Sequence, residues 1–167
     1  MNANDAKRDF DQSIEHVIAS YRFFLQAIPT EAMFASGSVH VGQFSFSRYS
    51  QAEAMVVELG WAFFIRLEGC LEALVHRLGI KGADVPGKIT AAGELSADEL
   101  RGYQAARDLR NIYHHGDGDW TLLSKVPTEV RPAADSEPHL LPEHLERFYA
   151  LFKKIAQSLT RPHLHAV

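Results

Sequence analysis

The chain has 167 residues, of which 46% are hydrophobic and 23% charged, a globular composition that excludes a largely disordered polypeptide. Its net charge of −4, from 17 basic and 21 acidic side chains, excludes the strongly basic surface typical of proteins that bind long nucleic acids. At this length we expect one domain over 1–167 that buries roughly 70% of its unfolded surface.

The start of the chain and its cysteine content indicate a cytoplasmic protein. Residues 1–9 are too polar for a secretory signal. The densest apolar run, Trp61–Ile65, is followed directly by Arg66, so no segment is expected to span a membrane. The chain has one cysteine, Cys70, which excludes an intrachain disulfide and favours a reducing compartment.

Apolar residues at spacings of three and four predict a first helix over 5–28, ended by Pro29. The connection over 30–49 is rich in Gly, Ser and Phe, and we expect it to be irregular and mobile. A short strand or extended piece is expected within it at Val39–Phe46.

The second helix is predicted over 50–78, with Ser50 and Glu53 as a capping box and Gly79 at its end. Apolar residues cover so much of its surface that we expect it to be the central helix of a bundle. Residues 80–95 contain several Gly and Pro residues and are predicted to be a loop.

Ser96 and Glu99 form a second capping box, which begins a third helix over 97–115. Gly116 is suited to the left-handed position after its end. The four main helices with apolar inner faces predict an all-α fold, a four-helix up-and-down bundle.

The last part of the chain contains a long loop and one more helix. Residues 116–141 are rich in proline and are predicted to be a long, irregular and mobile loop. The last helix is predicted over 142–160, with Pro142 in its first turn, and 161–167 is expected to be a tail.

The end of the third helix concentrates side chains that are useful in chemistry. Arg110 is followed directly by Asn111, and after three further residues by His115 and a glycine. This Arg-Asn-x-x-x-His-Gly pattern resembles the signature of the HEPN superfamily (higher eukaryotes and prokaryotes nucleotide-binding). In that signature a polar residue, often Asn, follows the Arg, and a His comes after four to six residues.

The resemblance implies a HEPN-type helical bundle and the activity of a metal-independent endoribonuclease, as in toxin–antitoxin and antiviral defence systems. Such an enzyme would cleave RNA through a 2′,3′-cyclic phosphate. His115 would transfer protons, because the pKa of histidine lies near neutrality. Arg110 would stabilise the phosphoryl charge with its planar fork, and Asn111 would orient the imidazole or contact the phosphate.

A second register of the motif also fits the spacing of the family. Arg107 is followed, after six residues, by His114. We favour Arg110 with His115 because the Asn after the Arg and the Gly after the His match the commoner form. Arg107 and His114 are then supporting groups.

Glu68 is a further supporting candidate, because it lies one turn from Glu72 on the central helix, among apolar neighbours. The favoured interpretation is that both carboxylates are solvated or pair with Arg66 and His76 of their own helix. The second interpretation is that one of them approaches the third helix and holds Arg110 or His115.

Arg110 and His115 diverge by roughly 140° around a helix axis. They would converge on one phosphate if the helix end frayed, or if two copies met across a two-fold axis. HEPN nucleases are similar in building one site from two protomers, so we expect a homodimer through the third-helix face. An antitoxin or other protein partner is also implied.

The helical phase divides the third helix into two sides. The side expected to face outward contains, besides the arginines and histidines, Leu100 and Tyr103, which indicate a partner surface. The side expected to face the core contains Ala105, Leu109, Ile112 and Tyr113.

Three alternatives to an active nuclease remain. The first is a non-catalytic HEPN-like module that binds a nucleotide, RNA or a protein. The second is a solvated helix face whose basic residues interact only with the helix dipole. A metal site built on His114 and His115 is disfavoured, because adjacent histidines diverge and no second His/Asp pair occurs at ligand spacing. We therefore expect neither metal nor cofactor.

Overall fold

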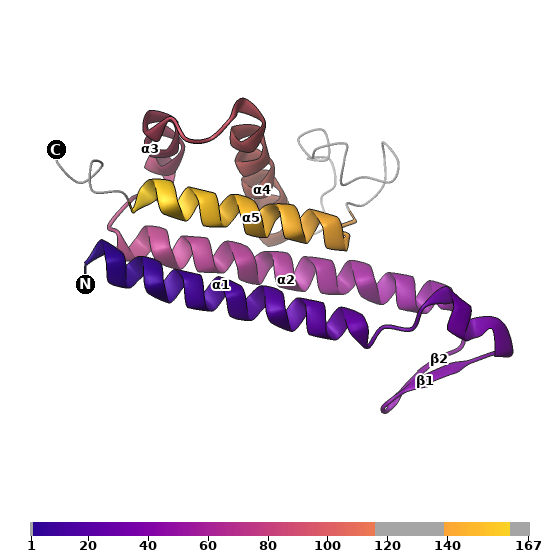
Figure 1. The fold of residues 1–167 in the computed structure, drawn as a ribbon. Helices are drawn as coiled ribbons and strands as arrows, with labels where there is room; N and C mark the ends of the chain where they lie inside the picture. Colours follow the sequence, from indigo (N-terminus) through magenta and orange to yellow (C-terminus); the bar gives the residue numbers. More distant parts are fainter. Residues whose placement is uncertain (1, 116–138, 161–167) are drawn as a thin grey trace.

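The computed structural model describes residues 2–115 and 139–160, without the side chains of His114 and His115 (Figure 1). These residues form five α-helices: α1 (Ala3–Gln26), α2 (Tyr49–Arg77), α3 (Val85–Ala92), α4 (Ala97–His115) and α5 (Pro142–Leu159). The structure also contains two short 3-10 helices, η1 (Glu31–Ser36) and η2 (Gly82–Asp84). It has two strands, β1 (Val39–Val41) and β2 (Phe44–Phe46). The all-α class is confirmed, and no described helix is long and apolar enough to cross a membrane.

Three of the four main helices lie side by side. α1 runs antiparallel to α2 and α5, whereas α4 crosses behind them at a steep angle (Figure 1). The expectation of a regular up-and-down bundle is therefore wrong for α4. The physical reason is α3, which packs against α5 and turns the chain before α4 begins.

The core lies where α1, α2 and α5 face one another, with α4 closing one side. Its largest fully buried side chains include aromatic and branched residues from all four helices: Tyr21, Phe64, Leu67, Leu109, Phe152 and Ile155. Burying each of the Phe, Leu and Ile side chains among them contributes roughly 1.5–3 kcal/mol. The predicted central position of α2 is confirmed, because it contacts the other three main helices.

The ends of α1 and α4 follow local sequence signals. The backbone N–H of Asp5 donates to Oδ1 of Asn2 over 2.8 Å, which caps α1. In α4, the Ser96 N–H donates to Oε2 of Glu99 over 2.7 Å, and the Glu99 N–H donates to Oγ of Ser96 over 3.2 Å. This reciprocal pair confirms the predicted capping box.

The start of α2 differs from the prediction. The helix begins at Tyr49, so Ser50 and Glu53 lie inside it and do not form a capping box. Instead, the Ser47 N–H donates to Oε1 of Gln51 over 2.7 Å. The side chain of Gln51 thus accepts a backbone N–H before the helix, a role that was expected of Glu53, two residues later in the chain.

Residues 80–95 contain the helices η2 and α3, so the prediction of a loop is wrong. Pro86 lies in the first turn of α3, where its missing N–H needs no partner. Gly93 has a left-handed backbone (φ +66°) just after the helix. Val85 and Ile89 are buried one turn apart, so tertiary burial stabilises a helix whose Pro and Gly residues mark its ends.

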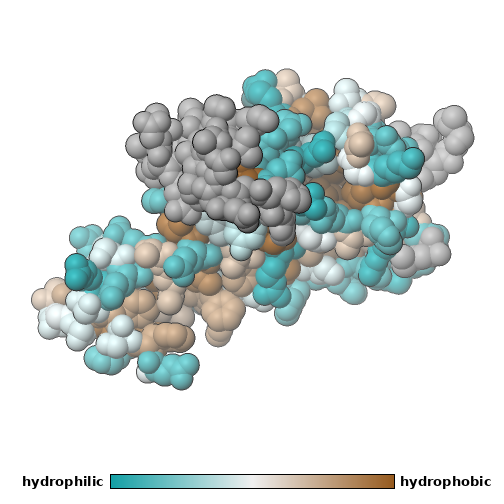
Figure 2. All heavy atoms as spheres, turned by 180° about the vertical axis from the view of Figure 1, so that it is seen from behind, coloured by the Kyte–Doolittle hydropathy of each residue, from teal (hydrophilic) through white to brown (hydrophobic). Residues whose placement is uncertain are grey.

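The connection between α1 and α2 contains the expected extended piece as a two-stranded antiparallel hairpin. Val39 pairs with Phe46, and Val41 with Phe44. Large apolar side chains are exposed at this end of the molecule: Phe23, Phe24, Met33 and Phe44. Figure 2 shows apolar surface where the hairpin projects.

The segment before α5 touches α2 at a glycine. A Cβ added to Gly60 would lie 1.8 Å from the carbonyl oxygen of Leu140, a fully buried residue. No side chain fits at Gly60 unless this segment moves. The absence of a side chain therefore sets how closely the start of α5 approaches the central helix.

We expect Gly60→Ala to lower the free energy of unfolding by about 1–3 kcal/mol, because the methyl group overlaps the backbone at Leu140. Gly69→Ala on the same helix is the matched control, because nothing lies within 4 Å of its added Cβ. Helix propensity alone should make that control more stable by up to about 1 kcal/mol. Urea unfolding measures both, and equal effects of the two substitutions would contradict the close contact.

Candidate functional site

The candidate site forms where α4 crosses α2. Arg107 and Arg110 lie one turn apart on α4, and Glu68 and Glu72 lie one turn apart on α2. Residues three or four apart share one face of a helix. The crossing therefore brings a basic stripe and an acidic stripe together.

Arg110 forms ion pairs with both carboxylates. Its Nε lies 3.3 Å from Oε2 of Glu68, and its Nη2 contacts Oε1 of Glu72. The Nε atom is buried and has no aligned hydrogen-bond acceptor, so its interaction with Glu68 is electrostatic. The expected approach of a glutamate from α2 to Arg110 is thus present, and both glutamates contribute to it.

Glu68 is an unusual carboxyl, because only 8% of the residue is exposed. Its pKa is raised to about 7, mainly by burial and in addition by the negative charge of Glu72. The positive charges of Arg110 and Arg107 lower the pKa and so oppose part of this shift. Glu68 consequently exchanges its proton close to neutral pH.

A hollow of about 390 Å³ opens beside this ion-pair cluster. Its walls come from α2, α4, α5 and the η2–α3 region, and its apolar lining includes Leu71, Val75, Ile80, Val85 and Phe152. The polar lining consists of Glu68, Glu72, His76, Tyr103, Arg107 and Arg110. Concave apolar walls with a few convergent polar groups are typical of small-ligand sites.

Arg107 differs from Arg110 in its contacts. It lines the same pocket and is partly buried. It lowers the pKa of Glu68 and of Tyr103 through space. Among the described residues, however, no ion pair or hydrogen bond involves its guanidinium.

Tyr103 was expected on an outward surface, and this expectation is wrong. The residue is 8% exposed and lines the pocket, and Leu100 beside it packs partly buried against the core. Tyr103 shares the helix stripe of Arg107 and Arg110, a signal already present in the sequence. It could not be used there, because the helix α3 that turns this face inward was not expected.

The inward side of α4 agrees largely with the prediction. Ala105, Leu109 and Ile112 are buried as expected. Tyr113 is 52% exposed, so its assignment to the core is wrong. Its ring stacks on Trp61 with centroids 5.5 Å apart, which shows that it covers the edge of the core.

The remaining motif residues are only partly described. Asn111 is exposed and lies one turn beyond Arg107. α4 continues to His115, but the side chains of His114 and His115 lie outside the described part of the structure. The structure therefore brings Arg107, Arg110 and Glu68 together and leaves the contacts of both histidines as predictions.

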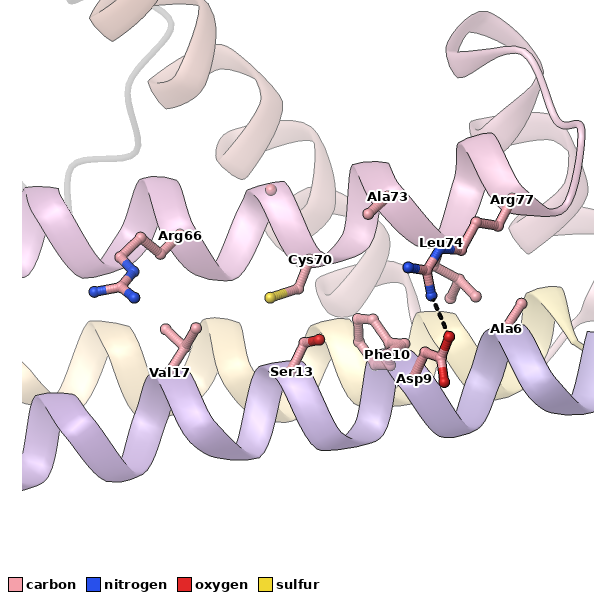
Figure 3. A pocket seen from close by; sticks show the side chains of 11 residues that line it. Ala6, Asp9, Phe10, Ser13, Val17, Arg66, Cys70, Ala73, Leu74 and Arg77 are labelled. Atoms are coloured by element: carbon pink, nitrogen blue, oxygen red, sulfur yellow. Dashed lines mark hydrogen bonds and ion pairs between the residues drawn. The ribbon is translucent and has the colours of Figure 1, made fainter.

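A second hollow, of about 280 Å³, lies between α1 and α2 (Figure 3). Ser13 and Cys70 line it between Arg66 and the Arg77–Asp9 ion pair, whose Nη1–Oδ2 distance is 2.6 Å. Burial raises the pKa of the Cys70 thiol, although the nearby Arg66 lowers it. A thiol that keeps its proton is a poor nucleophile, so this hollow lacks an activated group.

Neither metal ligation nor known relatives add to this geometry. The described residues contain no group of three or more His, Cys, Asp or Glu side chains placed to hold a metal ion. No family model, curated protein or solved structure matches the chain. The function is therefore argued from the site alone.

The raised pKa of Glu68 predicts how stability depends on pH. The folded protein keeps a proton that the unfolded chain loses near its ordinary pKa of 4.5. This contribution to the free energy of unfolding is thus complete at low pH and is lost as pH rises toward about 7. Glu68→Gln, which cannot titrate, should remove a decrease on the order of 2 kcal/mol between about pH 5 and pH 8.

Urea unfolding of wild type and Glu68→Gln at both pH values measures this difference. All other ionisable groups are present in both proteins, so their effect cancels in the comparison. Glu15→Gln is the control, because hydrogen bonds from Lys153 and Tyr149 lower the pKa of that carboxyl instead. The same pH dependence in wild type and Glu68→Gln would exclude a raised pKa.

Proposed function

We propose that the protein is a metal-independent endoribonuclease of HEPN type, a cytoplasmic toxin or defence effector. The observation that carries this proposal is the pair Arg107 and Arg110 at a pocket, in a helix that continues through Asn111 to His115. Glu68 and Glu72 hold Arg110 in place. Guanidinium groups beside such a pocket are suited to stabilising the charge of a reacting phosphate.

The reaction needs one base, one acid and one charge stabiliser. A base removes the proton of an RNA 2′-hydroxyl, and the oxygen attacks the adjacent phosphorus. The P–O5′ bond breaks as an acid donates a proton to the leaving oxygen, and a 2′,3′-cyclic phosphate remains. In the favoured register His115 transfers protons, Arg110 stabilises the charge, and Asn111 assists, with Arg107, His114 and Glu68 in support.

A second candidate function is a non-catalytic module that binds a nucleotide, RNA or a protein. The observation that favours it is the charge balance of the pocket, where two glutamates offset two arginines. Such a site binds a ligand at one or two points, in keeping with the net charge of −4. RNA binding without cleavage would support this candidate.

Purified protein is expected to cleave single-stranded RNA in the presence of EDTA and to leave 2′,3′-cyclic phosphate ends. His115→Ala should lower kcat about 10²–10⁴-fold and Arg110→Ala about 10²–10³-fold, with a smaller loss for Asn111→Ala. Arg107→Ala and His114→Ala test the other register. Gel analysis with end-group identification measures each rate.

Arg101→Ala is the matched control for the arginine variants. Arg101 lies on the same helix, but its side chain is 72% exposed, and among the described residues it pairs with Asp98 alone. Circular dichroism verifies that each variant is folded. Wild type that leaves varied RNAs intact, or full activity in both histidine variants, would refute the nuclease and favour the binding module.

We also propose that the active form is a homodimer joined near α4. The support is the divergence of Arg110 and His115 by roughly 140° about the helix axis, which a second copy would compensate. The burial of Tyr103 removes the apolar surface once expected to drive this contact.

Light scattering at micromolar concentration is expected to give twice the chain mass of 18.7 kDa. Mixing inactive Arg110→Ala chains with inactive His115→Ala chains should restore part of the cleavage, because one composite site would then keep both groups. A monomer, or no restoration in a confirmed mixed dimer, would exclude the composite site.

Expression in cells is expected to arrest growth, because a nuclease released from its partner degrades cellular RNA. His115→Ala should relieve this arrest at equal protein level. An arrest that persists in His115→Ala would point to a toxic effect other than cleavage.

A further inference from the structure

We propose that Arg107 is the guanidinium that contacts the substrate phosphate, and that Arg110 is a positioning residue that holds α4 on α2. This inference rests on the proposed function and, within it, reverses the roles that the favoured register gives to the two arginines. The ligand class is a phosphodiester of single-stranded nucleic acid. The inference follows from what each guanidinium already contacts.

The charge of Arg110 is already compensated within the chain. Two carboxylates, from Glu68 and Glu72, engage its guanidinium. A phosphate that bound the same fork would have to displace one of these groups or lie beside the negative charge of Glu72 and, when it is ionised, of Glu68. Like charges at such distances repel, so the pair disfavours an anion at Arg110.

The guanidinium of Arg107, in contrast, is not held by a carboxylate within the part of the chain that the structure describes. Its side chain lines the same hollow, and among the described residues it has neither an ion-pair partner nor a hydrogen-bond acceptor. A half-buried guanidinium without a protein partner keeps its donors free to bond to a ligand. A phosphate at the mouth of the hollow would satisfy two of them with the bidentate geometry that arginine prefers.

The helical phase supports the same assignment. Asn111 lies about 40° and position 114 about 20° from Arg107 around the axis of α4. One straight stripe therefore contains an arginine, an asparagine and a histidine position. This alignment needs neither a frayed helix end nor a second copy, in contrast to Arg110 with His115.

The test separates phosphate contact from structural support by its salt dependence. The probe is a fluorescein-labelled single-stranded RNA with 2′-O-methyl groups, which cannot be cleaved because it has no free 2′-hydroxyl. Fluorescence anisotropy measures the Kd of this probe at KCl concentrations from about 50 to 200 mM. Each phosphate contact on a single strand contributes a slope of about −0.7 to log K against log salt concentration.

Arg107→Ala is expected to weaken binding and to reduce this slope by about 0.7, the value for one contact. Arg107→Lys should restore the slope, because the charge is kept, while binding stays weaker without the bidentate fork. If Arg107 had a purely structural role, the salt slope would not depend on whether residue 107 is charged. Arg101→Ala, with an exposed arginine on the same helix, is the control.

Arg110 is tested in a charge-neutral background, because removing it alone leaves a buried carboxylate without its cation. The triple variant Glu68→Gln, Glu72→Gln, Arg110→Met removes the whole cluster together. We expect it to keep the wild-type salt slope. A slope reduced by about 0.7 in this variant, with an unchanged slope in Arg107→Ala, would overturn the proposal.

Failure of this inference is distinguishable from failure of the proposed function. If wild type binds the probe with an Arg107-dependent slope but cleaves no RNA, the nuclease fails and the phosphate contact stands. If wild type cleaves RNA and the salt slope is the same in wild type and Arg107→Ala, the nuclease stands and this assignment fails. Wild type that does not bind the probe overturns the assignment.

Discussion

The packing of α2 against three other helices is the constraint on which the rest of the molecule depends. α1, α4 and α5 all contact it. Along most of its length, at least one side of α2 therefore packs against another helix. Most of its inward surface is apolar, and Gly60 admits the backbone of the segment before α5. Of the carboxylates that the structure describes, Glu68 alone is buried. A carboxylate so placed needs a cation, and α4 supplies it.

The ion pairs of Arg110 therefore connect the fold with the chemistry. They lie where α4 crosses α2, in the wall of the larger hollow. Because two carboxyl groups hold the guanidinium of Arg110, this side chain loses little conformational freedom when Arg107 beside it binds a ligand. The same ion pairs keep α4 from sliding along α2. Such preorganisation is useful to a site built on one helix. The structure thus explains why two arginines one turn apart have different surroundings.

Some local sequence signals predicted the ends of the helices correctly. The Ser96–Glu99 capping box and the start of α5 at Pro142 agree with the structure. The prediction of a loop over 80–95 was wrong, because Pro and Gly residues such as Pro86 and Gly93 occur both in loops and at helix ends. Only the burial of Val85 and Ile89 against the rest of the molecule favours a helix there. The short length of α3 makes it dependent on this packing.

The sequence by itself determined the all-α class, the approximate bounds of the four main helices and the concentration of Arg, Asn and His near the end of α4. These follow from periodicity and caps, which act within a few residues of one another. Only the tertiary structure decided that α4 crosses α2, that Tyr103 is buried, and that Glu68 and Glu72 both engage Arg110 while Arg107 stays unpaired among the described residues. Helical phase fixes where a side chain lies on its own helix, whereas its partners depend on how distant helices pack.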